Sequence, residues 1–396
     1  MLICFTTLKF YSMKKQPIAL LAGAVIISGL ILGYVFAGDK FLFLYSEISL
    51  FQEQPNSPAP QKKSFQGIFA GSWEQIGKIS AAATEKISEA IPDISTDGDS
   101  VQNQKEMTQP PRKSVPPSAV FSFAVIGDTQ NFNIENENGY FQQAVKSIRK
   151  LNPDFVVALG DLQGKCSGGK NCRRDYGYWE SIMEDLAEKT YAVQGNHDRI
   201  GGAKADEAWQ KEFDFPKNGP PGFLEIAYSF DFKNSRFVVL ASDNPKMHLI
   251  DVKQRIWLDQ NLAQNKKENI FVFFHEPAFP VYAVSGGSLD GYPKERDALW
   301  QILGKYNISA VFNGHEHIVT RRLVDSRIFP EAKNSIYQFV FGNTDSFDHE
   351  LPQSGVAEYA DQGQGRFGFV RVAGKEITVE TRGPDGKILD SFKFSK

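Results

Sequence analysis

The sequence is poor in cysteine and histidine, and it carries no excess of positive charge. Three cysteines in 396 residues are too few for a disulfide-rich scaffold and leave at most one intramolecular pair. A formal net charge of -3 gives no basic footprint, so we do not expect nucleic acid as a partner. The scarcity of histidine makes its placement informative, because four of the six histidines fall in short motifs, at His197, His275, His315 and His317.

Residues 17–37 form an uncharged apolar run that follows a pair of lysines. At about 1.5 Å per residue, a helix of this length spans roughly 30 Å, the thickness of a bilayer core. The pattern predicts a cytoplasmic N-terminus over residues 1–16 and a single transmembrane helix or signal anchor over 17–37, with the remainder on the extracytoplasmic side. The alternative is a cleaved signal peptide, because Val35 and Ala37 make a small-residue cleavage site, and the protein would then be secreted.

Residues 38–118 are predicted to be a flexible linker or stalk. The stretches 54–63 and 97–118 are rich in Gln, Ser, Pro and Lys, a composition that buries little apolar surface. Between them, residues 64–91 show loose helical spacing of apolar side chains, which indicates at most a marginal amphipathic helix.

The pattern changes at Ala119, and residues 119–396 are predicted to form one α/β domain. Apolar strand-like runs alternate with helical patterns, and strands dominate toward the C-terminus. Such an order predicts a layered domain with mixed sheets. The expected helices cover Tyr140–Leu151, 178–187, 251–264 and 295–305.

Five of the strand-like runs end in residues that commonly bind metals. The motifs are GDTQ at 127–130, GDLQG at 160–164, GNHD at 195–198, HEP at 275–277 and GHEH at 314–317. Ligands bind at the carboxyl edge of strands in open α/β sheets, so we expect these side chains to meet there. Carboxylate, imidazole and amide oxygen donors suit Mn, Fe or Zn better than a soft thiolate site would.

This set of donors favours phosphoester chemistry. Two divalent metals about 3.5–4 Å apart neutralise an anionic substrate, lower the pKa of a bridging water and clamp the attacking and leaving oxygens. A carboxylate is the natural bridge between them, and Asp161 is the candidate. A nearby histidine that binds no metal can protonate the departing alkoxide. Each motif alone has another explanation: GD and GNHD are also consistent with turns, and His275 and the GHEH histidines with structural or surface residues. The interpretation rests on five motifs occurring in order.

GDTQ, GDLQG, GNHD, HEP and GHEH, in this order, resemble the signature of the calcineurin-like metallophosphoesterases, over residues 119 to about 345. The resemblance implies a four-layer α/β/β/α sandwich with a dinuclear metal centre at the sheet edges. It implies hydrolysis of phosphomonoesters or phosphodiesters by a metal-bridging hydroxide. The substrate would be a phosphorylated small molecule or a lipid-linked phosphate. The alternative is a non-catalytic cell-surface binding or scaffolding module on the same fold.

The resemblance also implies a role for each motif residue. One metal would be held by Asp128, Gln130, Asp161 and His317, and the other by Asp161, Asn196, His275 and His315. His197 would be the acid or phosphate contact that binds no metal, oriented by Asp198. Gln130 departs from the family pattern, in which a histidine is usual, and leaves the identity of the first metal open. Asn131 stands where the purple acid phosphatase variant would place a tyrosine, which argues against that branch.

Cys166 and Cys172 flank a short loop directly after Asp161. In an exported domain this spacing predicts a small-loop disulfide, and the alternative is two free thiols. The same loop is basic, which would either steer an anionic substrate or simply face solvent.

Overall fold

The computed structural model describes residues 21–27, 30–37, 40–47, 119–164, 172–282, 286–346, 349–351 and 355–395. The chain divides into two compact units, Met1–Met107 and Thr108–Lys396. In the first unit the strands β1 (Leu21–Ile27), β2 (Leu30–Ala37) and β3 (Lys40–Glu47) form an antiparallel sheet.

The first unit differs from the single helix that the sequence predicted over residues 17–37. Strands β1 and β2 occupy most of this run and pair with Leu21 opposite Phe36. A continuous apolar run does not distinguish strand from helix, and the Val, Ile, Tyr and Phe residues of this run favour strands. Within the described residues, no helix has the length and apolarity needed to cross a bilayer. The helix expected within residues 64–91 lies outside the described residues.

The second unit contains two sheets and has the mixed α/β class that the sequence predicted. The six-stranded sheet runs in the order β16 (Ile388–Ser395), β15 (Glu376–Arg382), β14 (Phe367–Ala373), β4 (Val120–Ile126), β5 (Phe155–Ala158) and β6 (Thr190–Ala192). The seven-stranded sheet runs in the order β13 (Tyr359–Asp361), β11 (Val319–Val324), β12 (Ile336–Phe341), β10 (Ala310–Asn313), β9 (Asn269–Phe273), β8 (Ser235–Val239) and β7 (Tyr228–Phe232).

Parallel strands form the part of each sheet that carries the motifs. β4, β5 and β6 pair in parallel in the six-stranded sheet, and β8, β9, β10 and β12 do so in the seven-stranded sheet. The carboxyl ends of parallel strands lie at one edge. The motif residues that follow β4, β5, β6, β9 and β10 therefore come out at one edge of each sheet, and hydrogen bonds and ion pairs between the motifs show that the two edges meet.

An aromatic core joins the sheets. The ring of Phe123 on β4 lies 5.5 Å from the rings of Phe237 on β8 and Phe271 on β9, in edge-to-face arrangements. Tyr228 on β7 also donates a hydrogen bond of 2.8 Å to the Ala192 carbonyl on β6. These contacts hold the two strand edges, and hence the motifs, in a fixed relationship.

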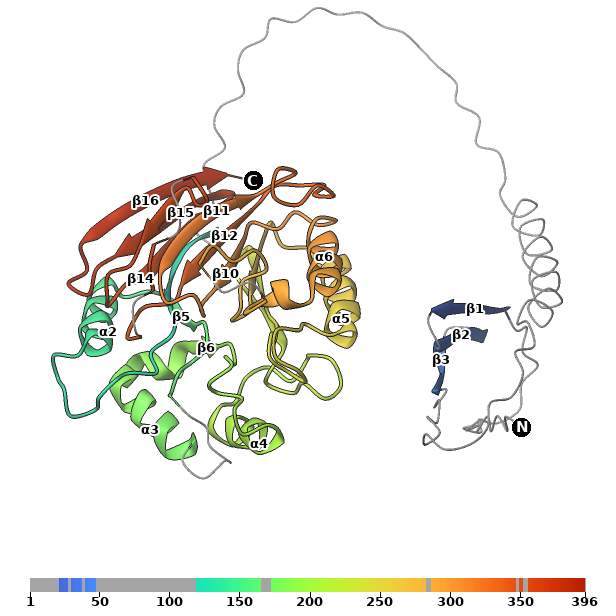
Figure 1. Cartoon of the computed structure of the whole chain (residues 1–396), viewed down its shortest axis with the longest axis horizontal. Helices are drawn as coiled ribbons and strands as arrows, with labels where there is room; N and C mark the ends of the chain where they lie inside the picture. The colour runs from blue at the N-terminus through green and yellow to red at the C-terminus, as the bar shows by residue number, and fades with distance from the viewer. Residues whose placement is uncertain are drawn as a thin grey trace, which may run out of the picture. The chain divides into compact units, whose positions relative to one another are not determined.

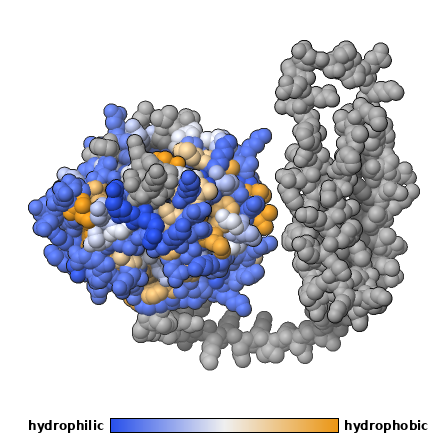
Figure 2. Space-filling view, turned by 90° about the horizontal axis from the view of Figure 1, so that it is seen from below, coloured by the Kyte–Doolittle hydropathy of each residue, from blue (hydrophilic) through white to orange (hydrophobic). Residues whose placement is uncertain are grey.

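Helices cover the outer faces of the sheets. The helices α2 (Tyr140–Leu151) and α3 (Cys172–Met183) contribute to the core of the six-stranded sheet. The helices α5 (Val252–Ala263) and α6 (Pro293–Leu303) pack with the seven-stranded sheet in a second core (Figure 1). Shorter helices lie between them: η3 (Glu184–Lys189), α4 (Ala203–Glu212) and η4 (Leu289–Gly291). The face of this unit seen in Figure 2 is mostly hydrophilic, with smaller apolar areas.

The predicted helices are present, with shifted ends. The helix over Tyr140–Leu151 is confirmed. α3 begins at Cys172, six residues before the expected start at residue 178, and changes to the 3-10 turn η3 after Met183. α5 begins after Asp251, whose side chain accepts a hydrogen bond of 3.0 Å from the Gln254 amide, the usual arrangement of a helix N-cap.

Candidate metal centre

Asp128, from the first motif, is joined to the fifth motif by its carboxylate. It follows β4 with a positive φ of 54°, and its side chain is buried. Both of its oxygens accept hydrogen bonds from the His315 amide, at 2.9 and 3.0 Å. A Cβ at Gly314 would collide with this carboxylate, so only glycine lets the two motifs approach so closely.

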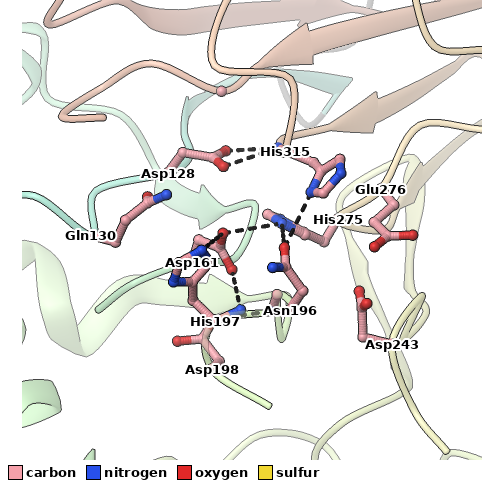
Figure 3. A network of polar contacts seen from close by, with 12 residues as sticks. Asp128, Gln130, Asp161, Asn196, His197, Asp198, Asp243, His275, Glu276 and His315 are labelled. Atoms are coloured by element: carbon pink, nitrogen blue, oxygen red, sulfur yellow. Dashed lines mark hydrogen bonds and ion pairs between the residues drawn. The ribbon is translucent and has the colours of Figure 1, made fainter. Parts of the chain in front are cut away.

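Asp161, from the second motif, lies at the centre of the cluster (Figure 3). Its Oδ1 accepts a hydrogen bond of 2.8 Å from the His197 amide, and its Oδ2 lies 3.4 Å from His275 Nε2. Burial acts to raise the pKa of this carboxyl, but the charge and hydrogen bond of His275 outweigh burial and hold the pKa below its usual range. Asp161 therefore carries the negative charge that a shared ligand between two cations needs.

Asn196 lies between two imidazoles. Its Oδ1 is 3.0 Å from His275 Nε2 and 3.1 Å from His315 Nδ1. The opposite ring nitrogens donate to backbone carbonyls: His275 Nδ1 to Leu159 at 2.8 Å and His315 Nε2 to Gly287 at 2.8 Å. A carbonyl only accepts hydrogen bonds, so His275 Nδ1 and His315 Nε2 each carry a proton, and His275 Nε2 and His315 Nδ1 are directed at the cluster.

Gln130 and His317 form the side of the cluster near Asp128. His317 Nε2 lies 3.0 Å from Gln130 Nε2 and 3.5 Å from Asp128 Oδ1. The amide oxygen of Gln130 is buried without a hydrogen-bond partner, a costly state that a bound cation would relieve. Asp128, Asp161 and His317 each offer a ligand atom, and the three atoms lie within 4.8 Å of one another.

Burial and neighbouring charges together set the protonation of the imidazoles. Burial and the charge of His275 lower the pKa of His315 to about 4, and burial lowers the pKa of His317 to about 4. Both rings are therefore neutral near pH 7, the form that binds a metal. Burial acts to lower the pKa of His275, but the charge of Asp161 outweighs burial and raises that pKa to about 10. A cation that binds His275 would displace its proton. The donor set and its protonation fit divalent cations.

His197 lies beside a cavity of about 320 Å³. The cavity is lined by Asp161, Asn196, His197, Tyr282, Gly287, His315, Glu316, His317 and His349. His197 Nδ1 lies 2.6 Å from the Gly164 carbonyl, and Nε2 lies 4.0 Å from Asp161 Oδ2. The side chain is 33% exposed, so Nε2 faces the cavity while the backbone fixes the other side of the ring.

The resemblance implied that Asp198 orients the His197 ring, but the hydrogen bonds of the Asp198 carboxylate in the structure go to other groups. This carboxylate is fully buried and accepts hydrogen bonds from the amides of Gly195 at 2.9 Å and Leu162 at 3.4 Å. The Tyr176 hydroxyl donates a third at 3.3 Å. The buried amides of the second and third motif loops need an acceptor, and Asp198 supplies it.

Two aromatic rings of the cavity wall, those of Tyr282 and His349, were not identified from the sequence. The rings of Tyr282 and His349 stack at 4.4 Å, and His349 stacks in turn on His317 at 4.5 Å. His349 follows β12 and belongs to no strand-end motif. The scarcity of histidine could have drawn attention to it, because only two of the six histidines, His248 and His349, fall outside the motifs.

The predicted disulfide lies outside the described residues. Cys166 is among residues 165–171, which the structure does not describe, and nothing is described of the Cys172 side chain. The pairing stays a prediction.

Comparisons with curated relatives find acid phosphatases. The tartrate-resistant acid phosphatase type 5 of Oryctolagus cuniculus is 23% identical over 304 residues, which cover 69% of this chain and 90% of that protein. Purple acid phosphatase 15 of Arabidopsis thaliana is 27% identical over 200 residues, which cover 43% of this chain and 36% of that protein. This second relative is a purple acid phosphatase, the branch that Asn131 was taken to argue against. Asn131 alone is therefore not enough to exclude that branch.

Solved structures share the fold at low identity. The purple acid phosphatase PPD1 from yellow lupin has a TM-score of 0.58 at 17% identity, and the match covers 71% of this chain and 55% of that one. This chain therefore spans little more than half of the lupin protein. PhoD has a TM-score of 0.53 at 16% identity, with 71% and 69% covered. The family model described as calcineurin-like phosphoesterase matches residues 121–319, about half of the chain. The chain belongs to the calcineurin-like phosphoesterase family.

Proposed function

We propose that this protein hydrolyses phosphoester bonds at a dinuclear metal centre. One cation would be held by Asp128, Gln130, Asp161 and His317, and the other by Asp161, Asn196, His275 and His315. The observation that carries the proposal is the position of Asp161. Its ligand atom lies within 4.8 Å of those of Asp128 and His317, while its Oδ2 lies 3.4 Å from His275 Nε2. One carboxylate thus faces both sets of donors.

The residues that line the cavity could not neutralise a phosphate group without bound cations. None of the nine described residues that line it is lysine or arginine, so the protein itself offers a phosphate little positive charge there. When bound, two divalent cations would neutralise the phosphoester and activate the attacking water. Oxygen and imidazole donors suit Mn, Fe or Zn.

In this proposal His197 handles the proton of the leaving group. Its Nδ1 hydrogen bond to the Gly164 carbonyl is kept whether the ring is neutral or charged. Nε2, on the cavity side, can therefore carry the mobile proton and donate it to the departing oxygen. The neighbouring Asn196 belongs to the metal ligands, and His197 lies outside that set.

The cavity limits the substrate class. A volume of about 320 Å³ is at the small end of ligand pockets, which span about 300–1,000 Å³. It accommodates a phosphoryl group with part of its leaving group, so larger substrates would extend out of the mouth. Small phosphomonoesters, phosphodiesters and the head groups of lipid-linked phosphates all satisfy this limit.

The test is a metal-dependent substrate screen on the full chain. The protein is stripped with a chelator, reloaded with Mn, Fe or Zn, and assayed on nitrophenyl phosphate, bis-nitrophenyl phosphate, nucleotides and lipid phosphates. We expect hydrolysis of at least one class that requires added metal and is lost in Asp161→Ala. Protein that carries two cations and hydrolyses none of these esters would contradict the proposal and favour a binding or scaffolding module.

A further inference from the structure

A second group of metal-ligand residue types lies beside the proposed dinuclear centre. Asp243 follows β8, Glu276 follows His275 at the end of β9, and His248 lies between β8 and α5. One ligand atom from each of Asp243, His248 and Glu276 lies within 4.8 Å of the others. Atoms that bind one cation at about 2.0–2.2 Å lie within about 4.4 Å of one another, so these three need at most a small adjustment to bind one.

The two carboxyl groups are buried and face one another. In Figure 3 the side chains of Asp243 and Glu276 point toward each other. Asp243 Oδ2 accepts a hydrogen bond of 2.8 Å from the Ser242 hydroxyl, while Oδ1 is buried without a hydrogen-bond partner. Burial raises the pKa of both carboxyl groups, so without a cation the pair shares a proton, and a cation close to both would take the place of that proton.

His248 supplies the third ligand atom. Its Nδ1 lies 2.7 and 2.9 Å from the two oxygens of Glu276. Among the described residues, Glu276 forms an ion pair with His248, and Asp243 forms no ion pair. Two carboxyl groups and one imidazole therefore offer a divalent cation three ligand atoms in one place.

The surroundings hold the ligands in place. The Ser242 hydroxyl donates to Asp243 and accepts a hydrogen bond of 3.2 Å from the Glu276 amide, so one side chain orients both carboxyl residues. His248 has a positive φ of 63°, a conformation that residues other than glycine seldom adopt. Its side chain is 25% exposed, which leaves an open side through which a cation and its waters can enter.

We propose that Asp243, His248 and Glu276 bind a third divalent cation, separate from the dinuclear centre. Two carboxylates and an imidazole suit Zn²⁺ or Mn²⁺. The cation would join the ends of the neighbouring strands β8 and β9 directly beside His275. Its role is therefore structural, because it would link the ends of two strands beside the dinuclear centre.

The test counts cations in the full chain. Stripped protein is reloaded with Zn²⁺ or Mn²⁺, desalted and analysed for metal per chain by mass spectrometry. We expect His248→Ala and Asp243→Asn each to hold one cation fewer than the wild type. The control is Asp206→Asn, whose carboxyl already pairs with Arg199 at 2.9 Å and should not change the count.

The count separates this proposal from the dinuclear centre. Asp161→Ala should lose the cations of that centre and keep the third. Crystals of the wild-type protein soaked in Zn²⁺ provide a measurement that does not depend on any variant folding, and should show an anomalous-scattering peak among Asp243, His248 and Glu276. An equal count in the wild type, His248→Ala and Asp243→Asn, or crystals without that peak, would overturn the third site. The three side chains would then be a hydrogen-bonded carboxyl pair with a histidine.

Discussion

His197 and Asp198 are consecutive in the chain, yet their side chains serve different parts of the site. The His197 ring lies at the cavity, with Nε2 4.0 Å from Asp161 Oδ2. Asp198 is fully buried and accepts hydrogen bonds from the Gly195 amide and the Tyr176 hydroxyl. The GNHD motif therefore combines a residue suited to chemistry with one that holds the loops together.

Asp198→Ala should destabilise the protein. The substitution leaves the Gly195 and Leu162 amides without their acceptor, and a buried donor without a partner costs about 1–3 kcal/mol. Tyr176→Phe removes only one of the three hydrogen bonds and should cost about 0.5–1.5 kcal/mol. Urea denaturation of both variants measures the loss. Normal stability of Asp198→Ala, with activity lost selectively on alkyl esters, would restore the ring-orienting role.

His197→Ala should keep its metals and lose activity according to the leaving group. A general acid contributes about 10²- to 10⁴-fold in rate when the leaving oxygen needs a proton. A nitrophenolate leaves without one and an alkoxide does not, so alkyl phosphoesters should be affected far more. The comparison is kcat on the two ester types, alongside a metal count. An equal loss on both would assign His197 to phosphate binding, and a loss of metal would make it a ligand.

Asp161→Ala and His315→Ala should differ in the cations they lose. Asp161 faces both sets of donors, so its removal should weaken both cations of the dinuclear centre together. His315 contacts Asn196 and belongs to one set, so His315→Ala should weaken mainly one cation. Titration with Mn²⁺ followed by metal analysis distinguishes the two patterns. A full complement at the dinuclear centre in Asp161→Ala would show that the assignment of Asp161 is wrong.

Gly195→Ala should disrupt the metal centre, whereas Gly177→Ala should not. A Cβ on Gly195 would collide with the backbone nitrogen and the carboxylate of Asp161, so the second and third motifs would have to separate. The matched control, Gly177, lies within α3, and the nearest atom to a Cβ added there is 3.9 Å away. There, alanine should stabilise the helix by about 0.5–1 kcal/mol. Metal retention and thermal unfolding are measured for both. Gly195→Ala with normal metal affinity would contradict the close approach.

The exported position of residues 119–396 stays a prediction, motivated by the uncharged run 17–37 behind a pair of lysines. In intact cells these residues should be accessible to added protease or antibody if the protein is anchored, or they should appear in the medium if residues 1–37 are cleaved. Protection of the domain until the cells are lysed would refute the prediction.

Peptide mapping without reductant on the same material would test the Cys166–Cys172 bond.

The sequence by itself determined which residues could form the site and the class of fold that carries them. Each ligand type in the five motifs directly follows an apolar strand, and the carboxyl ends of parallel strands gather at one edge, so position along the chain is enough to group Asp128, Asp161 and His275. The helix Tyr140–Leu151 was equally visible, because its amphipathic period is a local property.

Only the tertiary structure decided how those residues are used. The acceptors for the His275 and His315 rings are carbonyls of Leu159 and Gly287, which nothing in the motifs marks. His248 meets Glu276 across 28 residues of chain, a pairing with no periodic signal. The apolar run 17–37 suits strand and helix alike. Local sequence patterns indicate which side of a helix or strand is apolar. The carbonyl acceptors, the His248–Glu276 pairing and the conformation of the apolar run depend instead on which distant segments pack together.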